Sequence, residues 1–237
     1  MSNNHGGASV AANGRRVAGG AALVTLVTSL ASLFVLTRED VGTQAALRDY
    51  LARASGRMAA AWVFAVLSGL AWLGFVAAMR RLLPTSGGRD LFVAAAVAGQ
   101  ATSWAGVSLA SAAAPAEARE VPLAVFHAFG EAGHLAGAAG TAALGLALVG
   151  AASAGRRPSA SRVLPRWFWA MTSVVGVLLV PAAVAGPVAL PLTWLWLLGV
   201  ALLLLRRPSH CDRLQPTFRG SGRSDGLDAE AQTIAPV

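Results

Sequence analysis

Six apolar runs, separated by short polar stretches, dominate this chain of 237 residues. Each run holds 18 to 28 residues, and about 20 residues suffice for a helix to cross the hydrocarbon core of a bilayer. Because hydrocarbon offers no hydrogen-bond partner to the backbone, each run must be helical. The sequence therefore predicts an all-α fold, a polytopic transmembrane helical bundle of six spans without a soluble domain. The predicted spans cover about 18–36, 58–79, 91–113, 123–150, 167–185 and 188–205.

The composition agrees with a protein that lives in the lipid bilayer. Hydrophobic residues make up 55% of the chain and charged residues only 13%, whereas a soluble domain has about 25% charged residues. All 19 basic residues are arginine, and they lie at the ends of the runs and in the tails instead of on one folded face. The formal net charge of +8 therefore indicates membrane topology, and we expect no nucleic-acid partner.

The distribution of arginines predicts how the chain crosses the membrane. Residues 1–17 and 208–237 are polar and are predicted to be disordered tails. With both tails in the cytoplasm, 14 arginines fall on the inner side of the six spans and 5 on the outer side, as the positive-inside rule requires. The sequence therefore predicts a multi-pass protein of the plasma membrane with cytoplasmic N- and C-termini. The single cysteine, Cys211, lies in the second tail and excludes a disulfide framework.

The polar stretch 37–57, between the first two runs, has helical periodicity. Apolar side chains recur on one face and charged side chains fall between them. The apolar positions are Leu47, Tyr50, Leu51 and Ala54, and the charged positions are Arg48, Asp49 and Arg53. Two interpretations fit this pattern equally well: a short amphipathic helix on the membrane surface, or an outward extension of the second span.

Three ionisable residues share one face of the fourth run. His127, Glu131 and His134 are four and three positions apart, so they project from the same side of a helix. An ionisable group inside hydrocarbon costs about 2.5–3.5 kcal/mol on insertion scales, which indicates that the three are used or buried together. Gly133 and Gly137 form a GxxxG pair beside them, which predicts close contact with another helix and places the stripe against protein.

Polar groups on other spans are the expected partners of this stripe. Gln100 on the third span completes a candidate intramembrane polar cluster with His127, Glu131 and His134. Hydroxyl groups on the first, third and fifth spans are further candidates: Thr25, Thr28, Ser29, Thr102, Ser103, Thr172 and Ser173. The seven tryptophans are expected to anchor helices at the membrane surface or to pack against neighbouring helices.

Three interpretations of the stripe stay open. The residues could hydrogen-bond one another and neighbouring helices, as their spacing allows. They could form a proton or ion pathway. They could bind a metal ion or haem, although His127 and His134 lie two turns apart, too far to share one ion without distortion. The sequence has no Walker A, Rossmann or G-x-S-x-G motif, and we predict no catalytic, cofactor-binding or metal-binding residue.

The layout of the chain resembles a known group of proteins. The features that carry the resemblance are six short spans, a polar stretch after the first of them, and the Pro-x-x-Trp-Leu sequence at Pro191–Leu195. They are similar to small bacterial, actinobacterial-type integral membrane proteins with six helices and no assigned function. The resemblance covers about residues 15–207 and implies no activity, cofactor or site residue.

These observations lead to one expected function and two alternatives. We expect an integral plasma-membrane protein that has a structural role or is accessory to a membrane complex, without a cofactor, and we favour the absence of enzymatic activity. The first alternative is a small transporter or proton-coupled permease that uses the His-Glu-His stripe. The second is an intramembrane metal or haem protein. A transporter requires polar groups from several helices around one cavity, whereas the sequence shows only the fourth helix as strongly polar.

Overall fold

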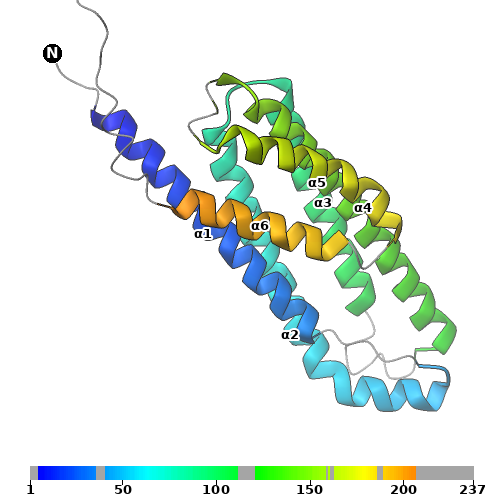
Figure 1. The fold of residues 1–237 in the computed structure, drawn as a ribbon. Helices are drawn as coiled ribbons and strands as arrows, with labels where there is room; N and C mark the ends of the chain where they lie inside the picture. Colours follow the sequence, from blue (N-terminus) through cyan, green and yellow to red (C-terminus); the bar gives the residue numbers. More distant parts are fainter. Residues whose placement is uncertain are drawn as a thin grey trace, which may run out of the picture. The chain divides into compact units, whose positions relative to one another are not determined.

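The computed structural model describes residues 5–35, 41–111, 121–158, 160, 163–185 and 189–206. Within these residues the chain is helical and contains no strand (Figure 1). The helices are α1 (His5–Val35), α2 (Gln44–Leu82), α3 (Gly87–Ser111), α4 (Leu123–Gly155), α5 (Arg166–Ala185) and α6 (Ala189–Leu205). All of them belong to one compact unit, Met1–Arg206. The predicted all-α fold is confirmed.

Five of these helices, α1 to α5, are long and apolar enough to cross a membrane. The last helix, α6, is apolar but has only 17 residues, which amounts to about 26 Å at 1.5 Å per residue. The hydrocarbon core of a bilayer is about 30 Å thick. The structure therefore supports a multi-pass membrane protein, while the sixth span stays a prediction.

The first helix is longer than the first apolar run. It begins at His5, so residues 5–17, which the sequence assigns to a disordered tail, are helical in the structure. Extending an existing helix is easy, because each added residue gains a hydrogen bond without forming a new nucleus. The other predicted tail, 208–237, lies outside the described residues.

The course of α2 decides between the two interpretations of the polar stretch 37–57. This helix is continuous over 39 residues, so the stretch from Gln44 onward extends the second span. Thr43 caps its start, because the Ala46 N–H donates to Thr43 Oγ1 at 3.2 Å. Figure 1 shows that α2 bends along its length. Ser55 and Gly56 separate its amphipathic part from its apolar part, and Gly/Ser pairs are frequent sites of bending.

Residues 44–58 of α2, called the amphipathic segment below, pack against the start of α4. The predicted apolar positions of this segment are all buried, in one cluster with residues from outside it: Val41, Leu47, Tyr50, Leu51, Ala54, Met58 and Phe126. Gln44 Nε2 donates to the Val121 carbonyl at 2.9 Å, and the Leu123 N–H donates to Gln44 Oε1 at 2.8 Å. The apolar face of the segment thus covers protein instead of the membrane surface.

The helices α3 and α4 make backbone-to-backbone contacts at glycines. A Cβ atom at Gly99 would lie 2.9 Å from the Gly140 carbonyl oxygen, and a Cβ at Gly106 would lie 2.7 Å from the Gly133 oxygen. Distances this short leave no room for a side chain, so the glycines allow the two helices to approach closely. Gly133 therefore contacts a helix of its own chain. The Cβ position of Gly137, in contrast, is open.

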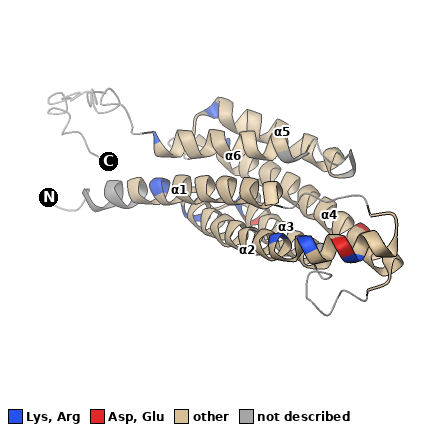
Figure 2. Cartoon of the chain, turned by 90° about the horizontal axis from the view of Figure 1, so that it is seen from below, with Lys and Arg blue, Asp and Glu red and all other residues tan. Residues whose placement is uncertain are grey.

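One end of the bundle, called the arginine-rich end below, gathers most of the basic residues. Gly19, midway along α1, lies beside Leu204 and Leu205 at the end of α6. Figure 2 shows basic residues near the start of α1, the start of α5 and the end of α6. This end holds nine of the twelve described arginines: Arg15, Arg16, Arg80, Arg81, Arg89, Arg156, Arg157, Arg166 and Arg206. The amphipathic segment carries the other three, Arg48, Arg53 and Arg57.

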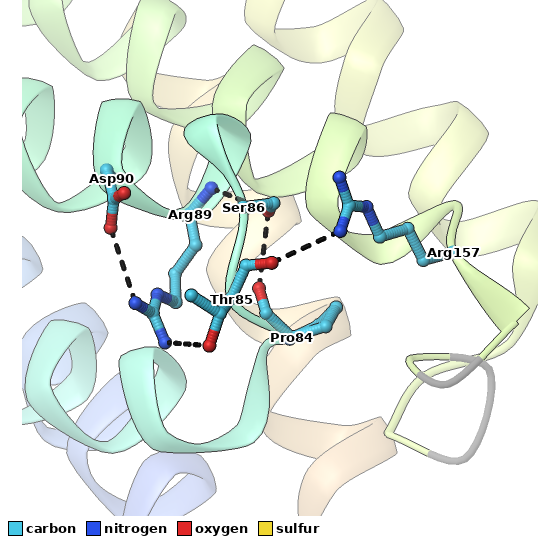
Figure 3. Close-up of polar contacts among 6 residues, drawn as sticks. All are labelled: Pro84, Thr85, Ser86, Arg89, Asp90 and Arg157. Carbon is cyan, nitrogen blue, oxygen red and sulfur yellow. Dashed lines mark hydrogen bonds and ion pairs between the residues drawn. The ribbon is translucent and has the colours of Figure 1, made fainter.

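Side-chain contacts hold the turn between α2 and α3 at this end (Figure 3). Ser86 Oγ accepts a hydrogen bond from the Arg89 N–H at 3.3 Å. The Arg89 guanidinium donates to Thr85 Oγ1 at 3.1 Å and pairs with Asp90 at 3.5 Å. Arg157, which follows α4, donates to the Thr85 carbonyl at 3.1 Å. These contacts fix the turn against the end of α4.

Candidate ligand pocket between the helices

The ionisable stripe of α4 faces away from the bundle. His127, Glu131 and His134 are all exposed, whereas the sequence places them against other spans. Within the described residues, no hydrogen bond or ion pair joins one of them to another. The His127 ring meets the ring of its neighbour Phe126 at 5.9 Å between centroids. The three side chains therefore form no site inside the bundle of this chain.

The position of the stripe along α4 explains how an apolar helix carries it. Arg156 and Arg157 directly follow the last residue of α4, Gly155, so the hydrocarbon core cannot extend beyond that point. Counting back about 20 residues, the length that crosses the core, leads to Ala136. His134 is about 32 Å from Gly155 at 1.5 Å per residue. With the core ending at Gly155, the stripe lies at its opposite face, where ionisable groups meet headgroups and water.

Gln100, the fourth member of the predicted cluster, lies elsewhere. It lines a pocket of about 330 Å³ between α1, α2, α3, α4 and α6, and none of the three stripe residues lines this pocket. Eight lining residues have hydroxyl or amide side chains: Thr25, Ser29, Ser32, Ser68, Gln100, Ser103, Thr141 and Thr193. Because they come from five helices, the pocket has the shared polar lining that a transporter requires.

Several hydroxyl groups of the wall also tie α1 to α2. Ser68 Oγ donates to the Thr25 carbonyl at 3.3 Å and lies 3.4 Å from Ser29 Oγ. Ser32 Oγ donates to the Ala61 carbonyl at 3.1 Å. A hydroxyl oxygen that donates its proton in this way keeps its lone pairs. These groups therefore hold the helices together and still present acceptors to the pocket.

Two polar groups of the wall have no partner within the described residues: the Gln100 amide and the Ser103 hydroxyl. Gln100 Nε2 lies over Gly69 of α2, 2.5 Å from the place that a Cβ of that residue would occupy. The amide fits between α2 and α3 only because Gly69 has no side chain. Both groups are thus available to a ligand.

Three tryptophans form flat apolar parts of the wall: Trp72, Trp104 and Trp194. The Trp72 Nε1–H donates to the Ala96 carbonyl at 3.3 Å, and the Trp104 Nε1–H donates to the Ala65 carbonyl at 3.2 Å. Both bonds join α2 to α3 and hold the rings in place. Fixed aromatic surface beside a few polar groups is typical of sites that bind and orient a small molecule.

The described part of the wall carries no charge. No ionisable side chain is among the described residues that line the pocket. In the described part of the chain, no group of three or more His, Cys, Asp or Glu side chains is placed to hold a metal ion. A charged ligand in this pocket would lose its water without gaining a counter-charge, at a cost of several kcal/mol. Such a wall is chemically suited to uncharged molecules that have both apolar and hydrogen-bonding surface.

The sequence names part of this site. Thr25, Ser29, Gln100 and Ser103 are expected as polar groups inside the bundle, and all four line the pocket. Thr172 of α5 is also expected there, but its hydroxyl is fully buried away from the pocket. That hydroxyl donates to the Phe168 carbonyl at 2.8 Å and accepts a bond from Trp196 Nε1 at 3.0 Å.

The sequence does not predict the other polar and aromatic residues that line the pocket. They are Ser32, Ser68, Thr141, Thr193 and the three tryptophans of the wall. One signal points to α1: Thr25, Ser29 and Ser32 are four and three positions apart, which is the spacing of the ionisable stripe on α4. Single hydroxyls such as Ser68 carry no such signal, because serine and threonine in membrane helices commonly bond to their own backbone.

Comparisons of the chain with protein-family models, with curated proteins and with solved structures find no match. The pocket is therefore the feature on which a function can rest.

Proposed function

We propose that this chain is a multi-pass membrane protein that binds an uncharged small molecule inside the bilayer, in the manner of a small transporter. The observation that carries the proposal is the pocket of about 330 Å³ with a polar wall built by five helices. Protein interiors are close-packed, and a cavity whose wall presents unpartnered polar groups offers hydrogen bonds to a molecule that fills it. The free Gln100 amide and Ser103 hydroxyl therefore favour a bound ligand over a purely structural role.

The proton-coupled and metal-binding alternatives both depend on the stripe of α4. That stripe is exposed and does not line the pocket, so the pocket lends it no support as a proton path or a metal site. We therefore retain a transporter function, with Gln100 and not the stripe as the central ligand-binding residue. An accessory role in a membrane complex rests on composition alone.

We propose that the protein lies in the plasma membrane with its arginine-rich end in the cytoplasm. Nine of the twelve described arginines lie at that end, and basic residues favour the cytoplasmic side. The beginning of the apolar run of α1, at Gly19, and the end of α6 meet there, as an even number of crossings requires, so α6 counts as the sixth span. The stripe of α4 and the amphipathic segment then lie at the outer face.

Native mass spectrometry of the intact chain tests the proposal. The protein is extracted from the cell membrane into polymer-bounded nanodiscs, so that detergent does not displace a bound molecule. We expect the wild-type chain to carry one bound molecule. We expect Gln100→Leu to lower the occupancy about tenfold, because leucine has a similar volume but leaves the ligand without its hydrogen bonds.

Thr102→Val is the matched control. Thr102 is on the same helix and also has a polar side chain, but its hydroxyl donates to the Ala98 carbonyl at 2.7 Å and does not line the pocket. The occupancy of this variant should equal that of the wild type. A wild-type chain without a bound molecule, or equal occupancy in Gln100→Leu and the wild type, contradicts the proposal.

A further inference from the structure

A second cavity adjoins the pocket on the other side of Trp104. It has a volume of about 200 Å³ and is lined by Trp62, Ala65, Val66, Trp104, Val107 and Ser108. Three of these residues, Ala65, Trp104 and Val107, line the first pocket as well. The two cavities therefore share one wall, which α2 and α3 build together.

The two cavities differ in their chemistry. Eight residues with hydroxyl or amide side chains line the first pocket, whereas Ser108 alone among the described lining residues brings a hydroxyl to the second. The second cavity reaches the surface of α2, because Trp62, which lines it, is 45% exposed. On a helix that crosses a membrane, such a side chain faces lipid chains. The second cavity thus lies at the lipid-facing surface, directly beside the first pocket between the helices.

We propose that the ligand is an uncharged lipid with a small polar head and an apolar chain, which enters sideways from the bilayer. This inference rests on the proposed function and specifies its substrate class. The head occupies the first pocket, where it bonds to Gln100 and Ser103. The chain passes Trp104 and lies in the second cavity. A water-soluble solute would leave that apolar cavity empty, and a lipid with a charged head would bury its charge without a partner.

Trp104 and Ala65 form the passage between head and chain. The Trp104 ring is held by its bond to the Ala65 carbonyl, and it lies over Gly69, where an added Cβ would collide with the ring. The Ala65 side chain is small and lines both cavities. A larger side chain at this position closes the passage without removing any hydrogen-bonding group of the head site.

Photo-crosslinking in lipid nanodiscs tests the inference. The probe is 1-decanoylglycerol with a diazirine in its acyl chain, a lipid with an uncharged head. We expect it to label the peptides of α2 and α3 that contain Trp62 and Ser108. An excess of unlabelled 1-decanoylglycerol should suppress this labelling. Decanoate, which has a charged head, and glycerol, which has no chain, should not suppress it.

Two variants with the same change at different positions complete the test. Ala65→Leu should lower the labelling about fivefold, because the added side chain overpacks the passage. Ala59→Leu, at an exposed position of the same helix, should leave the labelling unchanged. Even labelling of all exposed helix faces, equal labelling in Ala65→Leu and the wild type, or competition by decanoate overturns the inference. If the molecule bound to the wild-type chain lacks an apolar chain, this inference fails while the proposed function stands.

Discussion

The two sides of α3 pack in opposite ways. Toward α4, glycine pairs such as Gly99 and Gly140 bring the backbones together and leave no room for side chains. Toward α2, the Trp104 ring and the Gln100 amide lie between the helices, and cavities remain on both sides of that ring. Small residues thus fix one side of the helix while bulky residues hold the other side open. A membrane bundle can keep a binding cavity in this way without losing its helix contacts.

The largest loss of stability should come from disrupting the glycine contact between α3 and α4. Gly99→Leu forces a side chain into the Gly140 backbone, which has no flexible part that can move aside. We expect the free energy of unfolding to fall by about 3 kcal/mol, the upper range for overpacking, in a denaturant titration of the protein in mixed micelles. The control is Gly74→Leu, because a Cβ at Gly74 meets nothing within 4 Å. Equal losses in the two variants would show that the glycine contact is not tight.

A smaller effect should follow from adding one methyl group on the open side. Gly69→Ala places a Cβ against the Trp104 ring and the Gln100 amide. We expect a loss of about 1–2 kcal/mol from overpacking, partly offset by the better helix propensity of alanine, together with lower ligand occupancy. Gly74→Ala gains the propensity without the collision and should be slightly more stable than the wild type. A Gly69→Ala protein with full occupancy would contradict the assigned position of the ligand head.

A local effect of similar or smaller size should follow from releasing the amphipathic segment. Gln44→Ala removes both hydrogen bonds to the start of α4, each worth about 0.5–1.5 kcal/mol. Hydrogen exchange should become faster at the backbone amides of Leu123 and its neighbours. It should stay unchanged at the amides where α3 and α4 contact each other. Faster exchange at Gly99 as well would mean that the segment supports the whole bundle.

The smallest effect should come from the ionisable stripe. The triple change His127→Ala, Glu131→Ala and His134→Ala alters exposed positions and removes one ring contact, that of His127 with Phe126. The free energy of unfolding should therefore stay within about 0.5 kcal/mol of the wild type. Ligand occupancy should not change either. A large loss of stability in the same titration would indicate that the stripe lies in the interior of the protein.

Much of the fold can be predicted from the sequence, because membrane helices are determined by length and hydropathy. The apolar runs locate α1 to α5, and the periodicity of Leu47, Tyr50 and Leu51 identifies a buried face. What covers that face cannot be read from periodicity, since Phe126 of α4 lies far away in the sequence. The helical start of α1 is missed because polar composition indicates disorder, while an adjoining helix favours continuation.

The site is harder to predict, for a physical reason. Charged residues attract attention in an apolar sequence, but depth along the helix decides whether they lie in hydrocarbon, and His134 lies about 32 Å from the arginine-flanked end of α4. The residues that do meet inside the bundle are uncharged. Gln100 is recognisable because an amide in a span is costly. Its neighbours Ser68 and Trp104 become visible as site residues only when the packing of α2 on α3 is known.

The most direct measurement is an electron cryo-microscopy map of the chain in native nanodiscs, with a bound antibody fragment to aid alignment. The account predicts ligand density between the side chains of Gln100 and Ser103 and the hydroxyls of α1, with a thinner extension past Trp104. A map in which the Gln100 amide bonds to a neighbouring helix, with no space left between α1 and α3, would contradict it.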